Sequence, residues 1–367
     1  MPYQVTIDAR LLSSGIGTYV LNLIKSLKDC FGGPNIRALT SAKDVERMRA
    51  LCDEVRVVDA PIYTVREQFE IPRAARGADL LHVPHYNAPL LYWGKLLVTI
   101  HDLIHITDAT FRRTAASMVY ARPMFSLVTR RADHIISVSE FTKSQLLERL
   151  RVPAPKITVI RSGVSSHFCL RGREEAKSRI YSQHGLKRPY VLFVGNLKPH
   201  KNLKTLIRAF SQMCTHRDFD YQLVILGDDR KWKVGLVNEC AKLGINDRVL
   251  FVPQVPYEDL PWLYGAAEIL TMPSFIEGFG LPVLEAMACG TPVVCSRTAS
   301  LPEVAGDAAE YFEPTSADDL AAALERVLGS RELQETLRRK GLERVKLFSW
   351  HECARRTLEL YSKLLQE

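Results

Sequence analysis

Two glutamates at a fixed spacing are the residues that first suggest chemistry in this chain. Glu277 and Glu285 have seven residues between them, and the surrounding sequence predicts a strand, a glycine loop and a helix. The loop and the first helical residue are Gly278, Phe279, Gly280 and Leu281. Carboxylates accept hydrogen bonds from sugar hydroxyls, and the free amides at a helix N-terminus bind phosphate. The segment therefore suits a sugar nucleotide.

The same two glutamates also have a purely structural interpretation. Glu277 would then stabilise the N-terminus of the helix through the helix dipole, and Glu285 would be a solvated helical residue. However, the loop is expected at the carboxyl end of a parallel strand, which is the edge where open α/β sheets bind ligands. The spacing alone gives both interpretations equal weight.

A second strand-end loop, over residues 196–202, is rich in cations. A buried strand is predicted over 190–195, and Lys198, His200 and Lys201 follow it closely. Cations at such a position can neutralise a diphosphate as it becomes a leaving group. The alternative is a solvated basic loop that binds no ligand.

His101 follows an entirely apolar strand predicted over 96–100, which is typical of a buried parallel sheet. A histidine at a strand's carboxyl end can donate a hydrogen bond to a sugar hydroxyl or take part in proton transfer. Alternatively, Asp102 holds it as an ordinary loop histidine. His105 lies further along the loop and has the weaker claim to a site.

Gly15 and Gly17 lie between a strand predicted over 5–8 and a helix predicted over 18–28. A strand, a glycine-rich turn and a helix form the phosphate-approach unit of a Rossmann-like domain. The third glycine of the dinucleotide fingerprint and its ribose-binding acid are missing from this sequence. The sequence therefore argues against a nicotinamide dehydrogenase.

The motifs together resemble a known family. The segment 274–294, S-F-I-E-G-F-G-L-P-V-L-E-A-M-A-C-G-T-P-V-V, closely resembles the E-x7-E signature of the retaining, GT-B type glycosyltransferases of family 4. The phrase T-I-H-D-L, which contains His101, resembles the family's H-D-x motif. The family's Gly-Arg-x4-Lys arrangement is kept only in part, since Lys201 is present but Asn196 stands in place of the arginine.

The resemblance implies roles for individual residues. His101, Glu277 and Lys201 would be catalytic, with His101 near the C6 hydroxyl of the donor sugar and Lys201 on the departing phosphate. Glu285 would hold the ribose hydroxyls. The remaining donor-binding residues would be Gly15, Gly17, Asn196, Lys198, Gly278, Phe279, Gly280 and Leu281.

The resemblance also implies the reaction. A hexose would pass with retention from a nucleotide sugar to a glycan or polyprenyl-linked acceptor in bacterial surface-polysaccharide or glycolipid synthesis. GDP-mannose is the first expectation, because the phrases around His101 and Lys201 look most like those of mannosyltransferases. UDP-glucose or another UDP-sugar is the alternative, and a non-catalytic binding subunit is less favoured because the site residues are present. No cofactor and no metal are expected.

The fold class expected from the resemblance is α/β, a GT-B fold of two Rossmann-like domains facing each other across a cleft. A charged, glycine-containing stretch near 161–188 suggests the boundary. The predicted domains are an acceptor-side domain over 1–170 and a nucleotide-sugar domain over 171–349. A final helix, over 350–367, is expected to pack back on the first domain.

Composition limits the remaining possibilities. The chain has 367 residues, of which 47% are hydrophobic and 25% charged, as in soluble globular proteins. Neither a membrane-spanning run nor a signal peptide is found, so a cytoplasmic location is expected. Residues 1–170 carry 22 Lys and Arg against 15 Asp and Glu, a net +7 of the total +8. This basic half suggests peripheral contact with an anionic inner membrane surface, and no nucleic acid is expected as a partner.

Overall fold

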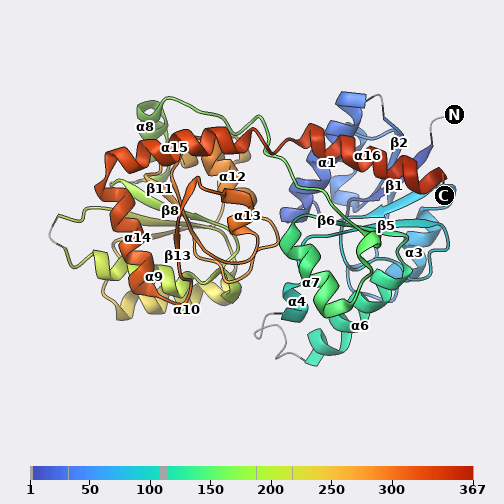
Figure 1. The fold of residues 1–367 in the computed structure, drawn as a ribbon, viewed down its shortest axis with the longest axis horizontal. Coiled ribbons are helices and arrows are strands. Elements are labelled where there is room, and N and C mark those ends of the chain that lie inside the picture. The colour runs from blue at the N-terminus through green and yellow to red at the C-terminus, as the bar shows by residue number, and fades with distance from the viewer. Residues whose placement is uncertain (1–2, 32, 108–114, 187, 217, 367) are drawn as a thin grey trace. The chain divides into compact units, whose positions relative to one another are not determined.

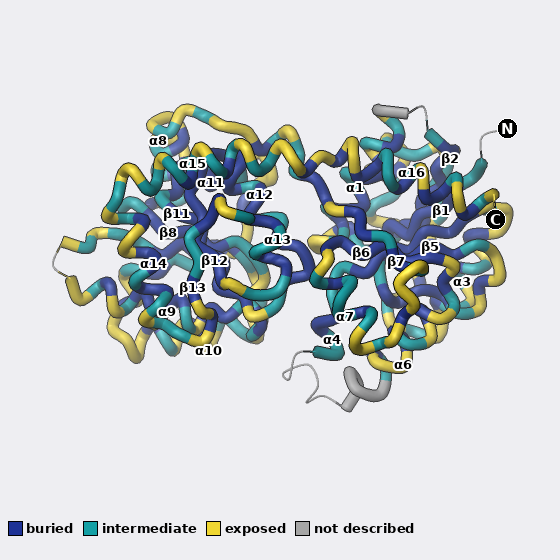
Figure 2. Tube along the Cα trace, viewed as in Figure 1, coloured by how far each residue is buried: buried dark blue, intermediate teal, exposed yellow. Residues whose placement is uncertain are grey.

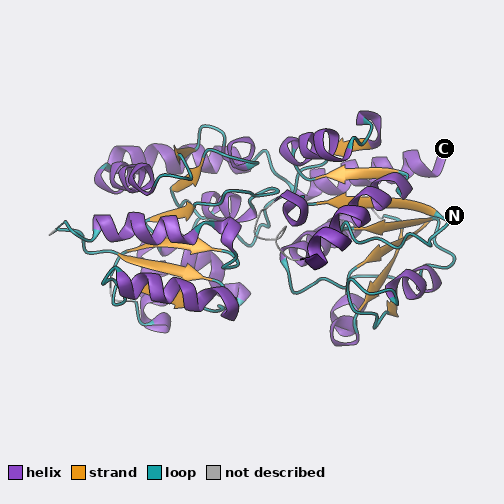
Figure 3. Cartoon of the chain, turned by 90° about the horizontal axis from the view of Figure 1, so that it is seen from below, coloured by secondary structure: helices purple, strands orange, loops and turns teal. Residues whose placement is uncertain are grey.

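The computed structural model describes residues 3–31, 33–107, 115–186, 188–216 and 218–366 (Figure 1). The chain divides into two compact units: unit 1 comprises 1–163 and 349–367, and unit 2 comprises 164–348. The sequence placed this division after residue 170. The division comes earlier because Val164 N donates to Phe348 O, at 3.2 Å, which ties the start of unit 2 to its end. Each unit is a parallel sheet with helices on its faces (Figure 3).

Unit 1 contains a seven-stranded sheet of order β3-β2-β1-β4-β5-β6-β7, and its described strand pairs are all parallel. Short apolar runs that alternate with helices produce such a sheet, because parallel neighbours need a crossover connection. The strands are β1 (Gln4–Asp8), β2 (Asn35–Thr40), β3 (Glu54–Val57), β4 (Leu80–Val83), β5 (Lys95–Ile100), β6 (His134–Ser137) and β7 (Ile157–Val159).

The helices of unit 1 form two layers. They are α1 (Gly15–Phe31), α2 (Val45–Arg49), α3 (Glu67–Ala74), α4 (Ile104–Thr107), α6 (Ala115–Arg131), α7 (Glu140–Leu150) and α16 (Trp350–Gln366), with 3₁₀ turns η1 (Ala42–Asp44) and η2 (Ala154–Lys156). The C-terminal α16 belongs to this unit and packs against α1, where the rings of Tyr19 and Trp350 lie 5.9 Å apart. His82 Nδ1 and Tyr361 OH are 2.7 Å apart, which joins α16 to the buried strand β4.

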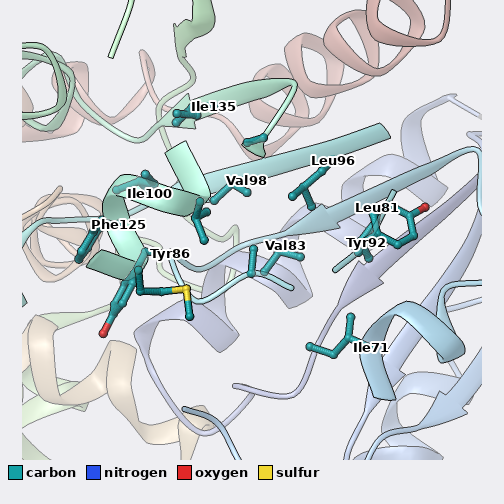
Figure 4. Packing of buried hydrophobic residues seen from close by; sticks show 14 of the residues in the cluster. Ile71, Leu81, Val83, Tyr86, Tyr92, Leu96, Val98, Ile100, Phe125 and Ile135 are labelled. Atoms are coloured by element: carbon teal, nitrogen blue, oxygen red, sulfur yellow. The ribbon is translucent and has the colours of Figure 1, made fainter. Parts of the chain in front are cut away.

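One apolar core lies between the sheet of unit 1 and helices α3, α6 and α7 (Figure 4). It includes Leu81 and Val98 from the strands, Ile71 from α3 and Phe125 from α6, none of which is exposed. Tyr86 stacks on Phe125 with ring centroids 4.0 Å apart, so the loop after β4 is held onto this core. Figure 2 shows the strands as the most deeply buried elements.

Unit 2 contains a six-stranded sheet of order β10-β9-β8-β11-β12-β13, also parallel in its described pairs. Its strands are β8 (Tyr190–Val194), β9 (Gln222–Leu226), β10 (Val249–Val252), β11 (Ile269–Met272), β12 (Val293–Ser296) and β13 (Ala309–Phe312). Its helices are α8 (Arg173–His184), α9 (Leu203–Met213), α10 (Arg230–Lys242), α11 (Leu260–Ala266), α12 (Leu281–Ala288), α13 (Leu301–Ala305), α14 (Ala317–Gly329) and α15 (Arg331–Val345), with 3₁₀ turns η3 (Pro199–Lys201) and η4 (Tyr257–Asp259).

Each sheet has a point where the order of its strands reverses. In unit 1 this point lies between β1 and β4, and in unit 2 it lies between β8 and β11. Loops that leave the carboxyl ends of such strands diverge and expose a crevice for ligands. The predicted site residues lie on the segments that follow β1, β5, β8 and β11, either in loops or in the first two turns of the helices after them.

Among the residues that the structure describes, no helix is both long and apolar enough to cross a bilayer.

Candidate active site

The two loops at the reversal point of unit 2 are joined to each other. Phe275 N donates to His200 O at 2.8 Å, so the main chains of the loops after β8 and β11 are in direct contact. Beside this link, Lys201 Nζ lies 2.6 Å from Glu277 Oε1. The same carboxylate oxygen accepts a hydrogen bond from Ser274 Oγ at 2.6 Å. The structure therefore brings together two residues that the sequence predicted independently.

The Lys201–Glu277 ion pair is mostly shielded from water, with side-chain exposures of 12% and 10%. An ammonium group has three N–H donors, so the contact with Glu277 leaves donors for a second anion. In a weakly solvated site, a fixed cation stabilises a neighbouring negative charge more strongly than it does in bulk water. Glu277 therefore holds the Lys201 ammonium group in a fixed position, from which it can bind a phosphate.

Asn202 positions this pair and was missed as a site residue. Its backbone is left-handed, with φ of 56°, and its Nδ2 donates to Pro273 O at 3.0 Å and to Pro314 O at 2.7 Å. One side chain thus ties the Lys201 loop to the start of the Glu277 loop. The available signal was an asparagine at a turn after a strand, since asparagine adopts the left-handed region more readily than most residues.

The predicted helix after Glu277 is confirmed as α12, with Gly280 before its first residue, Leu281. Gly280 has φ of 106°, a conformation that favours glycine. Ser300, also missed from the sequence, shapes this loop because its Oγ lies 3.0 Å from Glu277 O and 2.9 Å from Phe279 O. The Phe279 ring is buried against Phe348 at 5.9 Å, so Phe279 can offer a ligand only its main chain.

Glu285 lies one turn into α12 and is partly buried. Tyr264 OH donates to its Oε2 at 2.7 Å. Burial raises the pKa of Glu285 to about 7, and the hydrogen bond from Tyr264 lowers it only in part. Near neutral pH the carboxyl is therefore divided between its two protonation states, and ligand hydroxyls that donate to it favour the ionised state.

Asn196, which replaces the family's arginine, is exposed and bonds within its own loop. Its Oδ1 accepts from Lys198 N at 3.2 Å. Two glycines, Gly195 and Gly227, approach each other closely at the ends of the neighbouring strands β8 and β9. A Cβ atom on Gly227 would lie 1.8 Å from Gly195 O, so only glycine fits at position 227. No short-range pattern in the sequence indicates this close approach.

In unit 1, His101 borders a cavity of about 90 Å³ at the end of β5. Its Nε2 is buried and has no hydrogen-bond partner among the described residues, while the ring bonds to the Pro84 carbonyl. Burial lowers the pKa of His101 to about 4, and the bond to Pro84 raises it only in part. The neutral ring therefore uses Nδ1–H for Pro84 and presents Nε2 as an acceptor, which differs from the hydrogen-bond donor that was one of the two roles suggested by the sequence. The cavity is also lined by Ile16, His85, Tyr86, Ile100, Asp102 and His105.

The segment around Gly15 and Gly17 differs from the predicted loop. Helix α1 begins at Gly15, so both glycines belong to its first turn. A Cβ atom on Gly17 would lie 2.1 Å from Leu12 O, so glycine allows the helix to start against the preceding turn. Ile16, between the two glycines, lines the His101 cavity.

A buried ion cluster beside this cavity was also missed. Arg10 lies 2.7 Å from Asp8 Oδ2 and 3.0 Å from Glu67 Oε2, and its own side chain is 3% exposed. Glu67 in turn accepts a hydrogen bond from Asn87, in the loop after β4. The cluster fixes the loops after β1 and β4 relative to α3. A buried charge survives only when it is paired, but the sequence does not reveal which acids lie near Arg10.

The polar groups thus form one set in each unit. The set in unit 2 contains Lys201, Glu277 and Glu285, and the set in unit 1 contains His101 and the start of α1. Within the described residues, no group of three or more His, Cys, Asp or Glu side chains could hold a metal ion.

Comparison with known proteins defines the class. Residues 13–168 match the model of Glycosyltransferase Family 4, and residues 175–344 match the model of Glycosyl transferases group 1. The protein is a glycosyltransferase built from two Rossmann-like domains of the GT-B class. It belongs to glycosyltransferase family 4.

Individual relatives support this placement. An O-antigen chain mannosyltransferase B from Escherichia coli is 34% identical over 286 residues, which are 78% of this chain and 74% of the relative. A D-inositol 3-phosphate glycosyltransferase from Salinispora tropica is 30% identical over 324 residues, 81% of this chain and 66% of that one. Anabaena HepE, solved in complex with UDP-glucose, is 17% identical with a TM-score of 0.82, and the match covers 98% of this chain and 99% of HepE.

Proposed function

We propose that this chain transfers mannose with retention from GDP-mannose to a glycan or lipid-linked acceptor in bacterial surface-polysaccharide synthesis. The observation that carries the transferase site is the Lys201–Glu277 pair beside the N-terminus of α12. The choice of mannose is supported by the 34% identity with an O-antigen mannosyltransferase.

In this proposal, unit 2 holds the nucleotide end of the donor. Lys201 and the first amides of α12 bind the diphosphate and stabilise its charge as the glycosidic bond breaks. Glu285 accepts hydrogen bonds from the ribose hydroxyls, and Glu277 accepts one from the sugar. Lys198 adds a further cation beside Asn196. The role of the cations makes a metal unnecessary.

Unit 1 contributes to the sugar end. His101 Nε2 accepts a hydrogen bond from a hydroxyl of the transferred hexose, since a buried acceptor without a partner is costly until a ligand satisfies it. The acceptor hydroxyl attacks the anomeric carbon on the face that the phosphate leaves. The leaving phosphate takes the proton of that hydroxyl, so no separate protein base is needed.

A direct test uses the full chain with GDP-mannose, UDP-glucose and other nucleotide sugars in turn. The true donor raises the free energy of unfolding by about 2.7 kcal/mol at 100 times its Kd. GDP-mannose is expected to give the largest stabilisation and to be consumed when an α-mannoside acceptor is added. Stabilisation by UDP-glucose alone would replace mannose by glucose in the proposal, and no stabilisation by any donor would contradict a catalytic role.

Two further measurements address the mechanism. The anomeric configuration of the product, read by NMR, is expected to equal that of the donor. Chelation of divalent cations is expected to leave the rate unchanged. An inverted product or a rate that requires added metal would overturn the corresponding part of the proposal.

A further inference from the structure

The loop before β5 presents a tryptophan almost entirely to solvent. Trp93 is 92% exposed, the largest value among the exposed large hydrophobic residues that the structure describes. Phe69 on α3 is 63% exposed, and Leu91 is 45% exposed. Exposed single hydrophobic residues are common, but a contiguous exposed apolar patch marks an interaction site.

These three side chains border one groove on the surface of unit 1. Phe69, Leu91 and Trp93 line a groove of about 400 Å³ between α3 and the segment that leads into β5. The groove floor includes Ala75 and Tyr92, which are 1% and 7% exposed and belong to the core of unit 1. The patch is therefore backed by rigid core rather than by a loose loop.

The exposure of Trp93 is built into the fold. Arg131 donates to the carbonyls on either side of it, Tyr92 O and Gly94 O, the second at 2.9 Å. A Cβ atom on Gly94 would lie 2.5 Å from Tyr92 OH, so the tyrosine packs directly beneath the turn. With Tyr92 buried and both flanking carbonyls held, the intervening tryptophan side chain must point outward.

The charge around the groove is positive. Arg73 and Arg76 line it and are exposed, and no acidic residue is among its lining residues. Within the described part of the chain neither arginine forms an ion pair, whereas Arg66, just before α3, is paired with Glu70. Two uncompensated arginines beside exposed aromatic residues favour an anionic, amphipathic partner.

We propose that the groove formed by Phe69, Leu91, Trp93, Arg73 and Arg76 is a docking surface for an anionic lipid bilayer. Tryptophan and phenylalanine enter the boundary between headgroups and acyl chains, and the arginines contact lipid phosphates. Trp93 precedes β5 and so lies at the amino edge of the sheet.

Vesicle co-sedimentation of the full chain without nucleotide tests this proposal independently of sugar transfer. The probes are vesicles of phosphatidylcholine and vesicles of an equimolar phosphatidylcholine–phosphatidylglycerol mixture. Binding to the anionic vesicles is expected, with weaker binding at high salt because exposed charges are screened. Trp93→Ser should lower the partition coefficient by about tenfold or more, and each of Arg73→Gln and Arg76→Gln by about fivefold.

Val234→Ser is the matched control, because Val234 is 62% exposed on α10 in unit 2. This variant should bind vesicles as the parent does, and thermal unfolding should be unchanged for it and for Trp93→Ser. Absence of binding to the anionic vesicles, or an equal loss in the Val234 variant, would overturn the proposal. A concentration-dependent dimer in sedimentation velocity that Trp93→Ser abolishes would also overturn it, because the surface would then bind a second copy.

Discussion

Both units place polar residues after the carboxyl ends of their strands, but the two sets differ in electrostatic character. The reversal point of unit 2 has an ion pair, Lys201–Glu277, and a carboxyl whose pKa burial raises to about 7, Glu285. The cavity in unit 1 has half-buried histidines, and partial removal from water lowers the pKa of His85 to about 3 and that of His101 to about 4. The nearby charge of Arg10 is already paired with Asp8 and Glu67.

The difference follows from what each site would hold. A diphosphate gains negative charge as it becomes the leaving group, so fixed positive charge beside it stabilises the transition state more than the ground state. A sugar needs neutral donors and acceptors in fixed directions, and a protonated histidine would offer no acceptor. The comparison therefore predicts that charge-removing changes in unit 2 affect chemistry more than changes of hydrogen-bonding groups in unit 1.

The largest effect is expected for Lys201→Ala. Removal of a cation aimed at the leaving group should lower kcat with GDP-mannose by about 10²- to 10³-fold. Lys204→Ala is the control, because Lys204 is exposed on the following helix, α9. Near-normal turnover in a folded Lys201 variant would remove the ion pair from the proposed mechanism.

A smaller effect is expected for His101→Phe. The substitution keeps a ring of similar volume but removes Nε2. The fall in kcat/KM should be about 10- to 100-fold, which corresponds to the free energy of one lost buried hydrogen bond. His105→Phe, a change in the same cavity, should have less effect. The parent rate should show no histidine titration between about pH 5.5 and about pH 8, because the pKa of His101 lies near 4. A rate step near pH 6.5 that His101→Phe removes would contradict a neutral acceptor.

Glu285 should make donor affinity depend on pH. In the proposed mechanism its carboxylate accepts hydrogen bonds from the ribose hydroxyls, so donor affinity should fall by about tenfold from pH 8 to pH 6, and Glu285→Gln should remove this dependence. Titration calorimetry with GDP measures it. A pH-independent affinity in the parent would remove Glu285 from the nucleotide site.

The same residue should also affect stability. The folded-state pKa of Glu285, about 7, exceeds the ordinary value of 4.5, so the folded state binds this proton more tightly than the unfolded state does. The stabilisation that results from proton binding is complete below pH 4.5 and is lost as pH rises through 7. Glu285→Gln should therefore unfold with a free energy on the order of 1–3 kcal/mol higher than the parent near pH 8, with little difference near pH 4. Equal stabilities at both pH values, measured by denaturant titration, would contradict the raised pKa.

The smallest effect is expected for Lys198→Ala. Lys198 lies on a partly exposed loop, so it should weaken GDP binding only about fivefold, and more so at low salt. A loss as large as that of Lys201→Ala would show that Lys198 takes over the function of the arginine missing at Asn196.

Much of the fold could be predicted because its signals are local. Apolar runs such as 96–100 and 190–194 became β5 and β8, and the helix after Glu277 began at the predicted residue. The start of α1 was predicted three residues late, at Thr18 instead of Gly15, and glycine is intrinsically a poor helix former. Here Gly17 is required inside the helix by its contact with Leu12 O, and a packing requirement of this kind is not visible in a propensity.

The site was predictable only where its residues are close in sequence. Glu277 and Glu285 lie on one segment, and their common motif could be recognised. Asn202 and Ser300 support that segment from other loops, and no short-range pattern relates either of them to it. Arg10 and Glu67 are likewise 57 residues apart and meet only because the fold brings the start of α3 to the loop after β1.

The sequence by itself therefore determined the family segment, the parallel α/β architecture and the main candidates, Glu277, Glu285, Lys201 and His101. Tertiary structure decided that Lys201 pairs with Glu277 across 76 residues and that His101 is a neutral acceptor. It also decided that Tyr92 is buried while Trp93 faces solvent. The physical reason is that residue type and periodicity act over a few residues, whereas strand order decides which distant loops share an edge, and burial there decides their charge.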